Sequence, residues 1–352
     1  MNFSSDNQAG VSPRILQALI DASSGSNASY GNDSWTQQAE RRIADVFDAD
    51  VQVFFVATGT AANCLALSAL AQPWNAVICH AQAHVFTDES SAPEFFTGGA
   101  RLLPMETTSG KLLAADLAAA LARLPDARPH SIQPSAVSIT QASENGQVYR
   151  PDELQALCET AHAAGLRVHM DGARFANAVA YLGCEPAALA NHAGVDVLTL
   201  GASKSGALAA EAVVFFDKTL ARDFDMRRKR AGQLVSKGRL FGAQYSAWLQ
   251  DGHWLELAGH ANRCARELAA VLAAHPAVRI AWPVEANELI VTMPKALHAR
   301  LTAAGVGCYD WYADSLPSTM TVPEDEVPVR FVTAWSTTEA ELESLRDVLQ
   351  TP

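Results

Sequence analysis

Residues 166–174 read LRVHMDGAR, an apolar stretch that ends in an acid, a glycine and an arginine. The first five of them predict a strand that is covered on both faces of a sheet. Because open α/β sheets bind ligands at the carboxyl ends of their strands, Asp171 and Arg174 mark a candidate site. An ionised Asp171 can hold a cationic ring nitrogen, and Arg174 can bind a carboxylate in a two-pronged contact. A structural Asp–Arg pair across a turn is the alternative interpretation.

The same alternation of apolar strands and helices continues on both sides of this segment. Predicted strands cover residues 51–56, 76–79, 100–103, 136–140, 166–170, 195–200 and 212–216, and predicted helices cover 36–47, 61–71, 114–124 and 151–164. Nearly all of these strands are apolar throughout, as strands between two layers of helices must be. The pattern predicts an α/β large domain over residues 1–243, with a mostly parallel seven-stranded sheet.

The C-terminal part has a different pattern, which predicts a small α+β domain over residues 244–352. One helical stretch runs to about residue 275, and it is followed by strands at 278–282, 288–293 and 329–334, helices at 295–304 and 338–349, and a long loop at 315–328. The helical residues from 218 onward are predicted to connect the two domains.

The composition excludes several classes of protein. The chain has 352 residues, of which 49% are hydrophobic, so we expect a compact core and not a disordered chain. A net charge of −12 opposes binding to nucleic acid or to an anionic membrane and favours a small-molecule substrate. No apolar run approaches the ~20 residues of a membrane span, and the N-terminus lacks the pattern of a secretory signal. With six scattered cysteines that predict reduced thiols, we expect a cytoplasmic protein.

A second cluster lies at residues 57–63, ATGTAAN, between a predicted strand and an Ala-rich helix. Free amide groups at the start of a helix, with Gly59 allowing close approach and Thr60 adding a hydroxyl, make a cradle for a phosphate. The segment matches neither the dinucleotide fingerprint nor the P-loop. An ordinary capped turn between strand and helix is the alternative.

A third cluster is VDVLTLGASKSG at residues 195–206, in which Lys204 follows an apolar strand and is flanked by small residues. Such surroundings suit a lysine that forms a Schiff base, although a surface lysine at a strand end would have the same pattern. A phosphate cradle, an acid for a pyridinium nitrogen and an imine-forming lysine are the parts of a pyridoxal phosphate (PLP) site. The three clusters together therefore predict PLP as the cofactor.

A metal site is not predicted. His80 and His84 have the spacing of two ligands on one helix face, but they follow a predicted strand, and no HExxH motif accompanies them.

Almost the whole chain resembles the low-specificity L-threonine aldolases, PLP-dependent enzymes of fold type I. The residues that carry the resemblance are Ser5-Asp6-Asn7, Tyr30-Gly31-Asn32-Asp33, the GTAAN stretch from Gly59, Ala83-His84-Val85, residues 169–174, Lys204 and Val329-Arg330-Phe331-Val332. The resemblance implies a fold-type I large domain and the reversible cleavage of L-threonine, L-allo-threonine and related β-hydroxy-α-amino acids, such as phenylserine, to glycine and an aldehyde. It also implies a homodimer or homotetramer with active sites shared between subunits.

The resemblance implies roles for individual cofactor residues. Lys204 would form the Schiff base, Asp171 would bind the ring nitrogen, and His84 would stack on the cofactor ring as a catalytic residue. The remaining residues expected to hold the cofactor are Gly59, Thr60, Arg174 and, from a neighbouring subunit, Lys237.

The substrate carboxylate would be contacted or positioned by Ser5, Arg174 and Arg330, with Tyr30 near the site at the interface. One position departs from the family pattern: many members have a histidine before the Asn-Gly that follows the central strand, where this chain has Glu144. Glu144 is a candidate replacement near the substrate hydroxyl, and a solvated loop carboxylate is the alternative.

The resemblance leaves two questions open. The base that removes the hydroxyl proton is His84, Glu144 or a bound water. The same cofactor residues would also serve a β-eliminating lyase or an aminotransferase of this fold, and these are the alternative functions.

Overall fold

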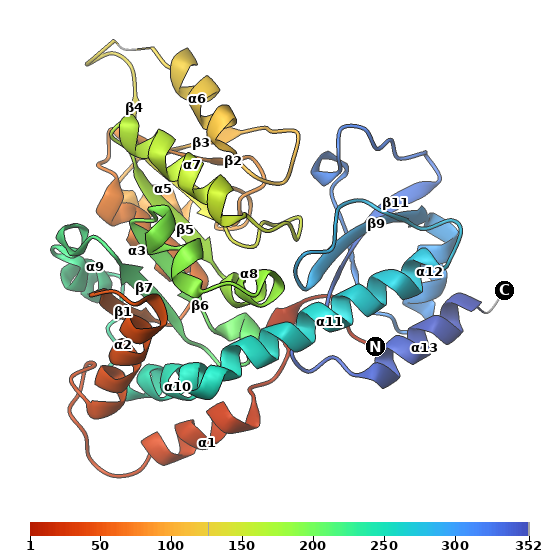
Figure 1. The fold of residues 1–352 in the computed structure, drawn as a ribbon, viewed down its shortest axis with the longest axis horizontal. Helices are drawn as coiled ribbons and strands as arrows, with labels where there is room; N and C mark the ends of the chain where they lie inside the picture. Colours follow the sequence, from red (N-terminus) through yellow and green to blue (C-terminus); the bar gives the residue numbers. More distant parts are fainter. Residues whose placement is uncertain (126, 351–352) are drawn as a thin grey trace.

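The computed structural model describes residues 1–125 and 127–350, and the larger part of it is a seven-stranded sheet between two layers of helices (Figure 1). The strands are β1 (Gln52–Val56), β2 (Asn75–His80), β3 (Arg101–Met105), β4 (Gln133–Thr140), β5 (Arg167–Gly172), β6 (Val197–Gly201) and β7 (Glu211–Phe215). Their order is β1-β7-β6-β5-β4-β2-β3. β7 runs antiparallel to both of its neighbours, whereas the other pairs are parallel. The predicted mostly parallel sheet is confirmed.

Both faces of this sheet are buried. One layer contains α2 (Ser34–Phe47), α6 (Ala114–Arg123), α7 (Pro151–Ala163), α8 (Phe175–Leu182) and α10 (Arg239–Leu249), and the other contains α3 (Gly59–Leu70), α4 (His84–Thr87), α5 (Ala92–Thr97) and α9 (Phe224–Arg230). On β1, Val53 and Phe55 enter the first layer, whereas Phe54 and Val56 enter the second. Because successive strand residues point to opposite faces and both faces are covered, apolar residues predominate on both faces of these strands.

A second, four-stranded antiparallel sheet forms the C-terminal part, with the order β10-β11-β9-β8. Its elements are β8 (Arg279–Ile280), β9 (Glu288–Pro294), β10 (Tyr309–Asp310), β11 (Glu326–Val332), α12 (Lys295–Ala303) and α13 (Glu339–Gln350). The long helix α11 (His253–Ala273) packs on α8 at one end and on this sheet and α13 at the other (Figure 1). The predicted division at residue 243 stays a prediction.

Several local features differ from the sequence-based expectation. The single helical stretch predicted to reach residue 275 is broken between α10 and α11, because Asp251 and Gly252 have positive φ angles of 56° and 74°. The loop predicted for 315–328 ends earlier, where β11 begins at Glu326. The helix α1 (Pro13–Ala22) and the two-residue strand β10 were not predicted.

The first residues of the chain join the two sheets. Phe3 is fully buried in the core of the C-terminal sheet, and its backbone bonds to Gly307 and Val332. Three residues later, Asp6 is buried beside Arg174, which follows β5 of the large sheet. This N-terminal segment therefore places Ser5 and Asp6 where the two parts of the molecule meet.

None of the helices in the described part of the chain combines the length and the apolarity needed to cross a membrane. All six cysteines are free thiols, and Cys64, Cys79, Cys158 and Cys264 are buried, as predicted for small core residues.

Candidate functional site

A cavity of about 330 Å³ opens at the carboxyl ends of the strands in the large sheet. Its lining comes from the loops after β1, β2, β4, β5 and β6 and from the start of β7, and it includes Gly59, Thr60, Asn63, His84, Glu144, Asp171, Arg174, Lys204 and Glu211. The fold thus brings together residues that are far apart in the sequence. Parallel strands achieve this because their carboxyl ends meet at one edge.

The start of α3 forms an open cradle at one end of the cavity. The hydroxyl of Thr58 accepts the amide hydrogen of Ala61 at 3.1 Å, and the carbonyl of Thr58 accepts that of Ala62 at 3.0 Å. The first two helical amides, of Gly59 and Thr60, receive no acceptor from residues 1–125 or 127–350. A Cβ atom added at Gly59 would meet nothing within 4 Å. Free amides facing open space at a helix start suit a phosphate.

Asp171, at the end of β5, is fixed in place by hydrogen bonds. It is 3% exposed, and its two oxygens accept the amide hydrogen of Ala173 at 2.9 Å and the side-chain amide of Asn63 at 2.7 Å. The same Asn63 amide nitrogen donates to Glu89 at 2.9 Å. Asn63 therefore holds two buried carboxylates, Asp171 and Glu89, in a defined relation to each other.

Glu89 also forms a hydrogen bond with His84 and shifts the pKa of its imidazole. The Nδ1 atom of His84 lies 2.9 Å from the same Glu89 oxygen, and this hydrogen bond raises the pKa of His84 despite its burial. Neither Asn63 nor Glu89 was predicted. Asn63 carried a usable signal, because it is a polar residue in an otherwise apolar helix; Glu89 lies in a polar loop and carried none.

The ligand atoms of His84, Glu89 and Asp171 lie within 4.8 Å of one another, a grouping that is also geometrically possible for a cation. The amide of Asn63 already donates to both carboxylates, so we interpret the group as a hydrogen-bonded network. His80 has separate partners, the hydroxyl of Thr107 at 3.1 Å and the carbonyl of Ser109 at 3.2 Å.

Glu144 also lines the cavity and is bonded to the backbone of His84. Its Oε1 atom accepts the amide hydrogen of His84 at 2.7 Å and the hydroxyl of Thr140 at 3.0 Å. Burial raises the pKa of Glu144 to about 7, because desolvation of the carboxylate outweighs these two hydrogen bonds. Glu144 is therefore poised to exchange a proton near neutral pH.

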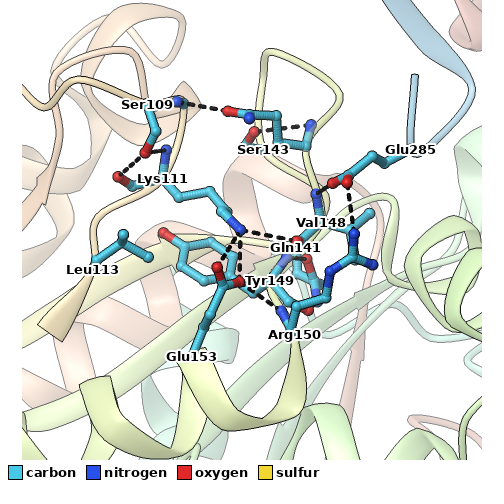
Figure 2. Close-up of polar contacts among 12 residues, drawn as sticks. Ser109, Lys111, Leu113, Gln141, Ser143, Val148, Tyr149, Arg150, Glu153 and Glu285 are labelled. Atoms are coloured by element: carbon cyan, nitrogen blue, oxygen red, sulfur yellow. Dashed lines mark hydrogen bonds and ion pairs between the residues drawn. The ribbon is translucent and has the colours of Figure 1, made fainter. Parts of the chain in front are cut away.

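The loop that carries Glu144 is anchored from several sides (Figure 2). The side chain of Gln141 accepts the amide hydrogen of Tyr149 at 3.0 Å and donates to its carbonyl at 3.1 Å. Lys111 donates to the carbonyl of Val148 at 3.1 Å, and Glu285 of the C-terminal part accepts the Val148 amide hydrogen at 2.8 Å. These bonds close the loop between residues 141 and 149 and hold Glu144 over the cavity.

Lys204 follows β6 in a short 3₁₀ turn, Ser203–Ser205, and lines the cavity. Its backbone is held from α10, where the hydroxyl of Tyr245 donates to the Leu200 carbonyl and the indole of Trp248 donates to the Ser205 carbonyl at 2.9 Å. No hydrogen bond or ion pair to its amine is formed by any residue that the structure describes. An amine without a partner, beside a fixed carboxylate, is what a Schiff-base lysine requires.

Glu211 begins β7 next to this lysine and is 5% exposed. Burial raises its pKa to about 7, although Ser203 and Lys204 act in the opposite direction.

A second cavity, of about 420 Å³, adjoins the first between the two parts of the molecule. His84, Glu144, Arg174 and Lys204 line both cavities. Residues that line only the second include Ser5, Glu288, Trp311, Tyr312 and Arg330. Lys204 and Arg330 therefore both line the second cavity, and Lys204 also faces the first, where Asp171 lies.

Arg174 already makes the two-pronged contact that the sequence led us to expect, but with Asp6. Its Nε and Nη2 atoms donate to the two Asp6 oxygens at 2.8 and 3.0 Å, and its Nη1 atom lies 2.7 Å from Glu288. Burial alone would raise the pKa of Asp6, yet the guanidinium of Arg174 keeps that pKa below its ordinary value. Contact of Arg174 with the substrate stays a prediction.

Two predicted residues lie apart from both cavities. Lys237 is exposed in the turn before α10, and the Tyr30 amide donates to the neighbouring Ser236 carbonyl at 2.9 Å. Because the resemblance gave both of them roles at a subunit interface, their roles stay predictions.

The arrangement has counterparts in known proteins. The family model described as Beta-eliminating lyase matches residues 2–296. The low specificity L-threonine aldolase of Pseudomonas aeruginosa is 43% identical over 346 residues, which cover 98% of this chain and 95% of that protein. The chain belongs to the threonine aldolases of the beta-eliminating lyase family. It is accordingly a lyase with the fold-type I architecture that the resemblance implied.

Solved structures agree with this assignment. The threonine aldolase of Leishmania major superposes with a TM-score of 0.91 at 29% identity, over 99% of this chain and 98% of its own. A structure of SPT with PLP superposes with a TM-score of 0.68 at 19% identity, over 99% of this chain and 86% of its own, which is a likeness of fold alone.

Proposed function

We propose that this lyase cleaves L-threonine, L-allo-threonine and related L-β-hydroxy-α-amino acids, such as phenylserine, between Cα and Cβ to give glycine and an aldehyde. Family membership and the names of its relatives support the aldolase activity. One structural observation carries the proposal: the unpaired amine of Lys204 shares a cavity with Asp171, whose carboxylate is fixed by Asn63 and the Ala173 amide.

The residues present fit PLP, which the family and the PLP-containing structural neighbour imply. The free amides at Gly59 and Thr60 would hold its phosphate, Asp171 its ring nitrogen and Lys204 its aldehyde carbon. When bound, PLP supplies an electron sink for the pair released as the Cα–Cβ bond breaks. Asp171 supports this chemistry because an ionised carboxylate at that position keeps a ring nitrogen protonated.

Glu144 is the base that we assign to the substrate hydroxyl. The Nδ1 atom of His84 is engaged by Glu89 at 2.9 Å, and this hydrogen bond raises the pKa of His84. Glu144 has a pKa of about 7, and its carboxylate form can take the hydroxyl proton near neutral pH. His84 would instead stack on the cofactor ring and hold Glu144 through its own backbone amide.

The carboxylate of the substrate would bind at Arg330, with Ser5 beside it in the second cavity. Arg330 is held less firmly than Arg174, since its contacts to Glu288 and to the Ser4 carbonyl are 3.3 and 3.4 Å long. Arg174 would position this region through Asp6 and Glu288.

We also propose a homo-oligomer, dimer or tetramer, in which Tyr30 and Lys237 approach the active site of a neighbouring subunit. Their exposed positions in adjacent loops leave them available for such a contact. A cytoplasmic location is consistent with the six free cysteines.

A product assay tests the function directly. Purified protein loaded with PLP is supplied with L-threonine, L-allo-threonine and phenylserine, and glycine, aldehyde, pyruvate and other keto acids are measured. We expect equal amounts of glycine and aldehyde, and we expect Lys204→Ala to lose both the yellow colour and the cleavage. Keto acids without glycine would favour a β-eliminating lyase or an aminotransferase instead.

A further inference from the structure

Glu288 begins β9 and is 1% exposed, at the point where the second cavity meets Arg174 and Arg330. Its Oε2 atom lies 2.7 Å from Nη1 of Arg174, and its Oε1 atom lies 3.3 Å from Nη1 of Arg330. One buried carboxylate thus faces both of the arginines that are expected to meet the substrate.

The two arginines are held very differently. Arg174 makes two aligned hydrogen bonds to Asp6 and a short contact to Glu288. Arg330 has two long contacts, and its guanidinium stacks on the ring of Trp311 at 4.0 Å. Its buried Nε atom finds no hydrogen-bond partner among the residues that the structure describes. Arg330 therefore has a free donor at Nε and only a long contact to Glu288. Both properties suit a guanidinium that exchanges Glu288 for a ligand carboxylate.

Glu288 itself is also weakly satisfied. Within residues 1–125 and 127–350, neither of its carboxylate oxygens receives an aligned hydrogen bond, although both are buried. A buried carboxylate without aligned hydrogen bonds lowers the stability of the fold, because its desolvation is poorly compensated. A purely structural ion pair usually has aligned donors. The carboxylate of Glu288 thus occupies a position beside Arg330 in which a ligand carboxylate could be better aligned.

The charge balance of the cluster indicates how Glu288 affects a ligand carboxylate. Asp6 and Glu288 supply two negative charges against two positive charges on Arg174 and Arg330, so the cluster is neutral. A carboxylate that arrives at Arg330 meets a guanidinium already paired with Glu288. It has to share that guanidinium or displace Glu288 from it.

We propose that Glu288 is an internal competitor for Arg330, which positions this arginine and weakens the binding of amino-acid carboxylates. This inference rests on the proposed function, because it takes Arg330 as the carboxylate site. A further consequence is selection against ligands with extra negative charge, since Glu288 repels them more strongly than it repels a single carboxylate.

The test is a ligand titration of the PLP-loaded protein. Glycine is added to wild type and to Glu288→Gln, and the dissociation constant is read from the cofactor absorbance. Glutamine keeps the size and one acceptor oxygen but removes the charge, so we expect glycine to bind about three- to tenfold more tightly, the effect of removing one poorly aligned ion pair. Aminomethylphosphonate, which carries more negative charge than glycine near neutral pH, should gain by a larger factor.

A matched control is Glu285→Gln. Glu285 also joins the C-terminal part to the large sheet, through Arg150 at 2.6 Å and the Val148 amide, but it lies outside both cavities (Figure 2). A glutamine at 285 can still accept the Val148 amide hydrogen, so the loop that carries Glu144 keeps this bond and the glycine affinity should equal that of wild type. Damage to the domain contact would weaken ligand binding in both variants, whereas loss of a competitor strengthens it in one.

A second variant, Glu288→Asp, tests the proposal if Glu288→Gln does not fold. Glu288→Asp keeps the charge but shortens the side chain by one methylene group, which moves the carboxylate away from Arg330, so a smaller tightening is expected. Unchanged or weaker glycine binding in a folded variant overturns the proposal, as does failure of both variants to fold. If wild type neither cleaves threonine nor changes its absorbance with glycine, the proposed function fails instead.

Discussion

Replacing Glu144 by glutamine should remove the catalytic base while preserving the local structure. The Oε1 atom accepts hydrogen bonds from the His84 amide at 2.7 Å and from the Thr140 hydroxyl at 3.0 Å, and a glutamine oxygen can accept both. The variant changes the ability to take a proton and little else. General-base catalysis is typically worth about 10²- to 10⁴-fold, so kcat for threonine cleavage should fall by roughly that factor.

The pH profile gives the sharper test. With a pKa of about 7, Glu144 is half ionised at neutral pH, and the ionised fraction falls about tenfold for each pH unit below that. In wild type, log kcat should therefore rise with a slope near one up to about pH 7 and level off above it. The acidic limb should disappear in Glu144→Gln, leaving a low and flat rate.

The assay is steady-state cleavage of L-threonine between pH 5 and 9, with acetaldehyde measured by a coupled reductase and the cofactor spectrum recorded at each pH. The control is Glu285→Gln, since Glu285 contacts the same loop at Val148 but lies outside the cavity. An unchanged acidic limb in Glu144→Gln, or a rate equal to wild type, would refute the assignment and return the role to His84 or a bound water.

Three other predictions concern neighbouring residues. Glu89→Gln should lower the pKa of His84, because its hydrogen bond to the Glu89 carboxylate raises that pKa; an NMR titration of the imidazole measures the shift, and an unmoved pKa would contradict the network. Glu211 has a folded-state pKa raised from 4.5 to about 7, so the folded protein binds this proton more tightly than the unfolded chain, and stability should fall as pH rises from about 4.5 to 7; Glu211→Gln should gain up to about 3 kcal/mol at pH 8 and little at pH 4.5, as measured by denaturant unfolding. Gly59→Ala should leave the stability of the PLP-free protein within about 1 kcal/mol, because its Cβ meets nothing within 4 Å, yet weaken PLP binding about tenfold or more in a titration, with Gly259→Ala as the helical control.

The sequence predicted the large sheet well because its strands are buried on both faces and are therefore rich in apolar residues. The same stretches placed Gly59, Asp171 and Lys204 at strand ends, where the topology brings them into one cavity. Elements whose pattern is weak were missed or misplaced. The two-residue strand β10 is too short to show a period, and the break before α11 depends on the backbone conformation of Asp251.

The sequence could not predict which side chains of the site pair with one another. Nothing in the local pattern of Arg174 indicates that Asp6, 168 positions earlier, takes its two-pronged contact. That pairing depends on the N-terminal segment running across the C-terminal sheet through Phe3. Glu89 and Glu288 were missed for the same reason, because the residues that they contact, Asn63 and Arg174, belong to other elements of the fold.

The carboxylates of this site differ in their protonation because their donors differ. Asp6 stays ionised because it accepts two hydrogen bonds from the Arg174 guanidinium, which holds its pKa low. Neither Glu144 nor Glu211 accepts a hydrogen bond from an arginine in the part of the chain that the structure describes, and burial raises the pKa of each to about 7, for Glu211 despite the nearby charge of Lys204. A site that must hold a cationic ring and also move one proton needs carboxylates of both kinds. Since arginine contact separates the two kinds, an arginine placed beside Glu144 would abolish its capacity to act as a base near neutral pH, even though the carboxylate itself remained.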